Sequence, residues 1–185
     1  SDAKNSQDCI DCHAGTWNDQ TQQKSSQSCK NCEKGKWSPK VGQTSASTCK
    51  DCAVAKYTSV LGASQESDCL LCSEGKYSTE VGTAASSCKS CVAGRYQKTK
   101  GSTSCKRCAV GQYQSSTAQT ECKTCPKGRF GNEEGRQSNC PVCPTGFVQP
   151  SAGQIDCTSC GIGTYQDQTE RFTCKNCGVG QYMKE

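Results

Sequence analysis

The chain of 185 residues carries 20 cysteines and a formal net charge of only +5, while leucine, isoleucine, valine and phenylalanine together number 18. So few large apolar residues exclude a domain with a sizeable hydrophobic core, and the modest charge argues against a nucleic-acid binder. Cysteine at this density is typical of disulfide scaffolds, which persist in oxidising compartments, so we expect an extracellular or cell-surface protein. No apolar run approaches the ~20 residues of a membrane-spanning helix, and we expect no membrane span.

One motif repeats ten times: a C-x-x-C pair, a glycine three residues later and an aromatic residue two further on. In the second copy, Cys29 and Cys32 lead to Gly35 and Trp37. The repeats, numbered here in chain order, begin at Cys9, Cys29, Cys49, Cys69, Cys88, Cys105, Cys122, Cys140, Cys157 and Cys174. Regular self-similarity of this kind predicts a linear array in which each unit gains stability from its neighbours.

The predicted organisation has three parts. Residues 1–8 are a polar segment and a candidate to complete a loop with a neighbouring copy. Residues 9–177 hold the ten repeats, and residues 178–185 form a half-loop. Repeat 3 has Ala55 in place of the first glycine, and repeat 8 diverges most because Phe147 follows its glycine at once.

Each repeat predicts a short strand bearing the aromatic residue, a turn and a return to the next cysteine pair. A second glycine falls ten residues after the second cysteine in six repeats, namely Gly42, Gly62, Gly82, Gly101, Gly135 and Gly153. No apolar pattern at helical spacing is sustained. The predicted fold class is a small disulfide-rich repeat array, an elongated rod of about ten short β-hairpin-like loops with little or no helix.

This pattern resembles the GCC2/GCC3 repeat, also called the ephrin-receptor-like cysteine-rich repeat, and the first module of tumour necrosis factor receptor cysteine-rich domains. The resemblance covers the chain from Cys9 onward. It implies an extracellular rod of small disulfide-closed loops, and it does not imply an enzyme.

The receptor half-module that the chain resembles implies a serial disulfide pairing, in which the second cysteine of each repeat bonds the first of the next. Carried over to this chain, the pairs are Cys12 with Cys29, Cys32 with Cys49, Cys52 with Cys69, Cys72 with Cys88, Cys91 with Cys105, Cys108 with Cys122, Cys125 with Cys140, Cys143 with Cys157, and Cys160 with Cys174. Cross-linking of whole C-x-x-C pairs two by two is the alternative. It would make the intervals between repeats alternate, and they do not.

The serial rule leaves Cys9 and Cys177 without partners, and these are candidates for disulfides between protomers. Residues 178–185 of one copy and 1–8 of the next would make sixteen residues between Cys177 and Cys9, the same gap as in the first three repeats. One hypothesis is therefore a head-to-tail filament. The alternatives are a window of a longer repeat chain, or two cysteines that bind outside residues or stay free.

Three other chemistries compete with a disulfide array. C-x-x-C pairs roughly 15–20 residues apart also match zinc-ribbon spacing. The haem-attachment signature C-x-x-C-H occurs at Cys9, Cys12 and His13, but His13 is the only histidine. No second base and no converging carboxylates accompany a nucleophile, so we expect no enzyme and no cofactor.

Basic residues recur at two positions of the repeat. They are Lys30, Lys50, Lys89, Lys106, Lys123 and Lys175 after the first cysteine, and Lys36, Lys56, Lys76, Arg95 and Arg129 before the aromatic residue. In a stacked array they would form basic stripes that either bind acidic polysaccharide or simply keep the surface soluble. Serine and threonine total 40 residues, so O-linked glycan is a further candidate, whereas no N-x-S/T sequon is present.

The sequence therefore predicts an extracellular structural protein, the protomer of a head-to-tail filament or part of a surface fibre. The alternative is the ligand-binding or spacer ectodomain of a surface protein similar to the tumour necrosis factor or ephrin receptors. Divergent repeat 8 is where a partner would be expected in that case.

Overall fold

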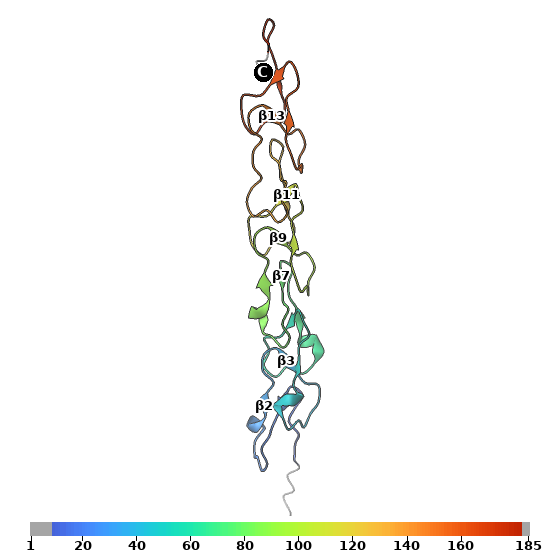
Figure 1. Cartoon of the computed structure of the whole chain (residues 1–185). Helices are drawn as coiled ribbons and strands as arrows, with labels where there is room; N and C mark the ends of the chain where they lie inside the picture. Colours follow the sequence, from blue (N-terminus) through green and yellow to red (C-terminus); the bar gives the residue numbers. More distant parts are fainter. Residues whose placement is uncertain (1–8, 183–185) are drawn as a thin grey trace, which may run out of the picture. The chain divides into compact units, whose positions relative to one another are not determined.

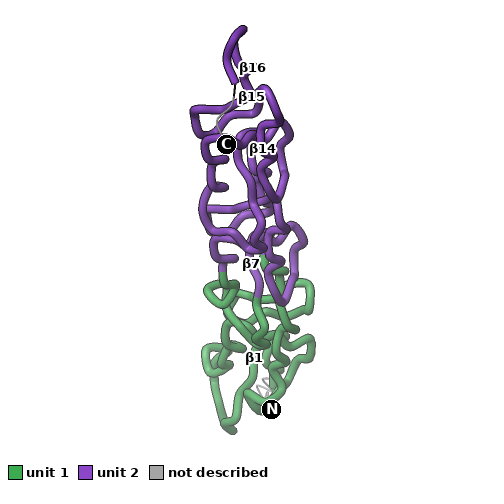
Figure 2. Tube along the Cα trace, turned by 45° about the horizontal axis from the view of Figure 1, so that its top comes forward, with its two compact units in different colours: residues 1–72, 78–89 green, residues 73–77, 90–185 purple. Residues whose placement is uncertain are grey.

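The computed structural model describes residues 9–182. The chain divides into two compact units, one of residues 1–72 and 78–89 and one of residues 73–77 and 90–185 (Figure 2). The predicted segment 1–8 and the last three residues of segment 178–185 lie outside the described residues.

Regular secondary structure consists of two-residue strands and three-residue 3-10 helices (Figure 1). The strands are β1 (Thr16–Trp17), β2 (Lys30–Asn31), β3 (Lys36–Trp37), β4 (Lys50–Asp51), β5 (Lys56–Tyr57), β6 (Leu70–Leu71), β7 (Lys76–Tyr77), β8 (Lys89–Ser90), β9 (Arg95–Tyr96), β10 (Lys106–Arg107), β11 (Gln112–Tyr113), β12 (Lys123–Thr124), β13 (Phe147–Val148), β14 (Thr158–Ser159), β15 (Thr164–Tyr165) and β16 (Lys175–Asn176). The 3-10 helices are η1 (Ser26–Ser28), η2 (Ala46–Thr48), η3 (Glu66–Asp68) and η4 (Ala85–Ser87). No α-helix occurs between residues 9 and 182, so the prediction of little helix is confirmed.

The strands form antiparallel hairpins, as predicted. In the first unit β1 pairs with β2, β3 with β4 and β5 with β6, and in the second β9 pairs with β10, β11 with β12, β13 with β14 and β15 with β16. The register is constant, because the residue at the aromatic position lies opposite the one that follows the first cysteine of the next repeat, as in Trp17 with Lys30 and Tyr113 with Lys123. Each hairpin therefore joins two consecutive repeats.

The 3-10 helices depend on loop length. Each of the four loops closed by cysteines 16 or 17 residues apart contains one, directly before its closing cysteine, and the loops closed over 14 or 15 residues contain none. In η1 the Ser25 hydroxyl caps the turn by accepting a hydrogen bond from the Gln27 N–H. The additional residues of the longer loops are thus taken up by one helical turn.

Every positive φ in the described chain falls on one of two repeat positions: the first glycine, or the turn residue ten after the second cysteine. Gly15 shows why glycine is used at the first position, since a Cβ there would lie 2.0 Å from the carbonyl oxygen of Gly62. Four residues hold a positive φ without being glycine, and they are Gln22, Ala55, Ala118 and Glu170. The backbone geometry is therefore kept even where the sequence lacks glycine.

Backbone hydrogen bonds join each repeat to the next in the same way. The Cys32 N–H donates to the Gly15 carbonyl at 2.8 Å, and the Gly42 N–H donates to the Cys12 carbonyl at 2.8 Å. In the second unit the equivalent bonds run from Cys108 to Gly94 and from Gly135 to Cys108. Within each unit the repeats therefore stack in sequence order.

The buried interior of both units consists mainly of disulfide-bonded cysteines. Cys32 and Cys52 in the first unit and Cys108 and Cys125 in the second are fully buried, whereas most valines and leucines are exposed, Val60 and Leu61 among them. The prediction that disulfides replace a hydrophobic core is confirmed.

Candidate functional site: the serial disulfides and the residues around them

Nine disulfides connect the repeats in series. They join Cys12 to Cys29, Cys32 to Cys49, Cys52 to Cys69, Cys72 to Cys88, Cys91 to Cys105, Cys108 to Cys122, Cys125 to Cys140, Cys143 to Cys157 and Cys160 to Cys174. Each bridge unites one of the pairs that the resemblance implied. The Cα–Cα distances of 5.6–5.8 Å are those of ordinary protein disulfides.

This bonding bears on the competing chemistries. A sulfur held in a disulfide is neither a thiolate ligand nor a nucleophile, and among residues 9–182 no three histidine, cysteine or acidic side chains converge as a metal site would require. In the haem-like signature, Cys12 is bonded to Cys29 and so is not available for a thioether, and His13 is exposed.

Two cysteines have no partner within the described chain: Cys9, which is exposed, and Cys177, which is partly buried. Under the serial pattern, Cys9 lacks the second cysteine of a preceding repeat and Cys177 lacks the first cysteine of a following one. The segments expected to join them across two copies, 1–8 and 178–185, lie wholly or in part outside the described residues.

Comparison with known families identifies the repeat. A family model described as "Tyrosine-protein kinase ephrin type A/B receptor-like" matches residues 75–120, 102–138 and 150–185, which together exceed half of the chain. The chain belongs to this family. The match lies on the cysteine-rich ephrin-receptor-like repeats, and with the disulfides it points to an extracellular or cell-surface location. A search of the curated proteins found no significant match.

The structure adds a feature of these ephrin-receptor-like repeats that sequence reasoning missed, a buried polar residue directly after the aromatic position. Gln114 is 2% exposed, its Nε2 donates to the carbonyl of Glu121 at 2.9 Å, and its Oε1 accepts the N–H of Ser116 at 3.1 Å. Gln97, Gln149 and Gln166 make the same two contacts in their own loops.

The acceptor carbonyl in each case precedes the cysteine that closes the loop, so the glutamine holds the loop shut beside its disulfide. In the longer loops the same position holds Ser38, Thr58 and Ser78, which are also buried. The sequence signal is a glutamine that follows the aromatic position in loops closed over 14 residues, as in Tyr113-Gln114.

Most basic residues of the expected stripes are paired locally. Lys30 binds Asp19 at 2.9 Å and lies 4.6 Å from the centroid of the Trp17 ring, and Lys175 binds Asp167 at 2.6 Å beside Tyr165. The hydrogen bonds from the two lysines hold the pKa of Asp19 and of Asp167 below that of an ordinary aspartate.

At the second stripe position, three ion pairs are formed, namely Lys36 with Asp51, Lys56 with Glu66 and Arg129 with Glu170. Arg129 also donates to the carbonyl of Cys140, and Arg95 donates to that of Cys105. The expected uniform stripes are therefore interrupted by neutralised positions.

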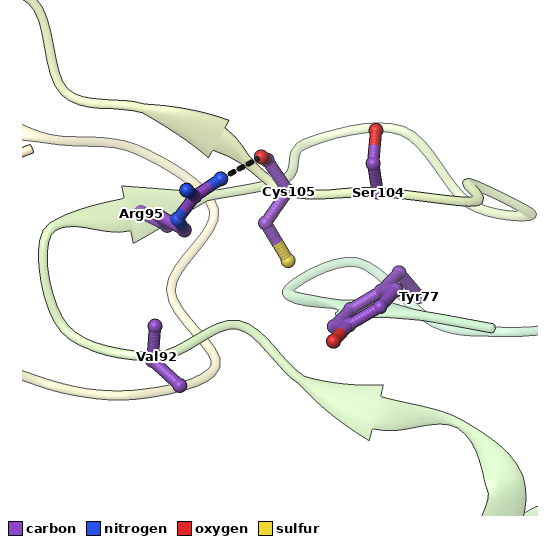
Figure 3. A pocket seen from close by; sticks show the side chains of 5 residues that line it. All are labelled: Tyr77, Val92, Arg95, Ser104 and Cys105. Atoms are coloured by element: carbon purple, nitrogen blue, oxygen red, sulfur yellow. Dashed lines mark hydrogen bonds between the residues drawn. The ribbon is translucent and has the colours of Figure 1, made fainter. Parts of the chain in front are cut away.

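A shallow hollow of 190 Å³ lies in the second unit (Figure 3). It is lined by Tyr77, Val92, Arg95, Ser104 and Cys105. The Arg95 guanidinium and the Tyr77 ring offer a cation and an aromatic face, and the Cys105 sulfur is held in its bridge to Cys91. The lining contains neither a histidine nor a carboxylate beside the Ser104 hydroxyl.

Proposed function

We propose that the protein is a non-enzymatic structural component of the cell exterior, an array of ephrin-receptor-like repeats whose terminal cysteines bond to further repeats of the same kind. In the filament form these repeats belong to a second copy of the chain, placed head to tail. In the surface-fibre form they belong to a longer chain. The observation that carries the proposal is the serial bridging, which provides a defined partner type for Cys9 and for Cys177.

The surface of the last repeats supports this proposal. In earlier repeats the first glycine is covered by the turn two repeats further on, so that a Cβ on Gly111 would lie 2.1 Å from the carbonyl oxygen of Gly153. Among residues 9–182, no atom lies within 4 Å of that position at Gly146, Gly163 and Gly180, in repeats 8 to 10. These glycines thus leave room for the close approach of another backbone.

Apolar exposure gives independent support. The position two residues after the second cysteine of a repeat is apolar in several repeats. Its side chain is 40% exposed at Val54 and 44% exposed at Val110, whereas at Ile162 and Val179, in the last two repeats, it is fully exposed. Burying such side chains against another repeat is favourable at about 25 cal/mol per Å² of apolar surface. A turn of another ephrin-receptor-like repeat fits this surface, because the same contact already exists between the earlier repeats.

Two single variants test the head-to-tail contact. Cys9→Ser keeps only Cys177 and Cys177→Ser keeps only Cys9, so we expect each purified variant to remain monomeric on non-reducing electrophoresis. In an equimolar mixture, oxidation of the Cys9 and Cys177 thiols by dissolved oxygen should yield a disulfide-linked dimer that dithiothreitol reduces to monomers. The unchanged protein should form a series of larger species under the same conditions. Monomers in all samples, with two reactive thiols per unchanged chain, would contradict the covalent filament.

The second candidate is the spacer or ligand-binding ectodomain of a receptor-like surface protein, which the family match favours. In repeat 8 Val148 is buried while Phe147 is 39% exposed, which leaves an apolar ring available to a partner. Electron microscopy separates the two candidates, since the structural proposal expects fibres of uniform width and the receptor proposal expects separate short particles.

A further inference from the structure

Positive charge is concentrated in one part of the second unit. Between residues 90 and 129 the chain has eight basic residues and a single acidic one, Glu121. Of the totals of 22 basic and 17 acidic residues, this leaves 14 basic against 16 acidic elsewhere. The net charge of +5 is therefore the sum of a strongly basic segment, residues 90–129, and a remainder that is slightly acidic.

Six of these basic side chains are exposed, and within residues 9–182 none of the six forms an ion pair. We call them the basic surface, and they are Lys98, Lys100, Lys106, Arg107, Lys123 and Lys127. Their exposure distinguishes them from Arg129 in the same segment, which is half-buried and bound to Glu170 at 2.6 Å.

A comparison of repeats 5 and 9 shows how the basic surface arises. Both loops close over 14 residues and both contain the glutamine contact, at Gln97 and Gln166. In repeat 9 Asp167, seven residues after the second cysteine, neutralises Lys175. In repeat 5 the same two positions hold Lys98 and Lys106, so an attractive pair is replaced by two like charges.

Like charges placed together disfavour the folded loop slightly unless an anion binds between them. In repeat 6 the corresponding loop position is Ser115, so Lys123 also lacks an acidic neighbour at that position. Two successive repeats therefore present lysines without the local carboxylate that repeats 1 and 9 provide.

We propose that the basic surface binds an acidic polysaccharide. Lys106 lies opposite Tyr96 and Lys123 opposite Tyr113 in the hairpin register, so each of two consecutive hairpins pairs a lysine with a half-buried tyrosine. Sugar rings pack on aromatic faces, and their sulfate or carboxylate groups pair with lysine and arginine. The hollow that Tyr77 and Arg95 line also includes Cys105, which directly precedes Lys106 of the basic surface (Figure 3).

A polysaccharide fits better than a nucleic acid for two reasons. The disulfides place the protein in an oxidising compartment, where acidic polysaccharides are abundant. In addition, no helix that could enter a nucleic-acid groove is found among residues 9–182.

The test uses the full oxidised chain and heparin as the probe. Lys98→Asp should create in repeat 5 an ion pair between the new aspartate and Lys106, equivalent to the pair that Asp167 and Lys175 form in repeat 9. The substitution thus removes one positive charge and neutralises a second. The matched control is Lys34→Asp, an exposed lysine of the first unit with the same change of charge. Binding is measured by titration calorimetry at low and at moderate ionic strength, and single-stranded DNA of similar charge is titrated in parallel.

We expect the unchanged protein to bind heparin more tightly than DNA, and the affinity to fall steeply with salt. Lys98→Asp should weaken heparin binding about tenfold or more, while Lys34→Asp changes it less than about twofold. Three results would overturn the proposal: no binding at low salt, equal weakening by both variants, or tighter binding of DNA. A thiol count on each variant checks that the nine bridges have formed.

Discussion

The buried glutamines are the most specific residue-level feature of the fold, and their loss has a measurable cost. Gln114→Ala would remove the hydrogen bonds to the Glu121 carbonyl and from the Ser116 N–H, each of which contributes about 0.5–1.5 kcal/mol. Because a repeat array opens locally, the quantity to measure is the opening free energy of the Cys108–Cys122 loop by amide hydrogen exchange. Gln119→Ala in the same loop, whose side chain makes only an exposed contact, should have little effect.

The left-handed turn residues predict a stabilising substitution. Ala118 holds a φ of 57°, a conformation that costs a residue with a Cβ about 1–2 kcal/mol. Ala118→Gly removes that strain, and the greater freedom of glycine in the open loop offsets part of the gain, so we expect up to about 1 kcal/mol more stability by hydrogen exchange. Ala109→Gly makes the same chemical change at a residue without a positive φ, and it should lower stability.

At the level of elements, the period, the hairpins and the scarcity of helix were predictable because each depends on spacing along the chain. The left-handed turns at Gln22 and Glu170 were not, because the backbone geometry is imposed there by loop closure and not by glycine. The glutamine contacts were missed for a related reason. A glutamine such as Gln114 has no apolar signature, and its acceptor lies beside it only when the loop closes over 14 residues.

Local ion pairs give one hairpin a predictable pH dependence. The hydrogen bond from Lys175 lowers the pKa of Asp167 in the folded loop, so this pair stabilises the loop above the pKa of an unfolded aspartate and is lost as the pH falls through the lower folded pKa. In Lys175→Met the pKa of Asp167, followed by NMR titration of its carboxyl group, should rise toward the ordinary value. An unchanged pKa would contradict the assignment of its cause.

Removing one bridge should open one loop and not the whole array. The combined substitution of Cys108 and Cys122 by serine releases a closure worth about 3 kcal/mol in the chain-entropy model. Hydrogen exchange should increase in residues 108–122 and in the hairpin that joins them to the next repeat, while more distant repeats stay protected. Cys9→Ser removes a cysteine that has no bridge within the chain and should leave exchange in residues 108–122 unchanged.

For the whole molecule, we expect the folded state to depend on the disulfide bonds. Full reduction and alkylation should abolish amide protection throughout the chain, because the buried interior consists mainly of cystine and few apolar side chains remain to take its place. Treatment with EDTA should leave protection intact, and at most two thiols per chain should react before reduction. Loss of protection with EDTA, together with many reactive thiols, would instead indicate metal-bound cysteines.

The serial order of the disulfides also determines what happens when a protease cleaves the backbone. Consecutive loops are separated only by the two residues inside each C-x-x-C, such as Lys30 and Asn31. A protease that cleaves anywhere between Cys12 and Cys29 leaves both new ends tied to the same cystine, so the severed strand stays attached. Most of the two-residue links are the strands β2, β4, β6, β8, β10, β12 and β14, each held between two bridges. Digestion would thus nick the protein many times before shortening it, which suits a component exposed to extracellular proteases.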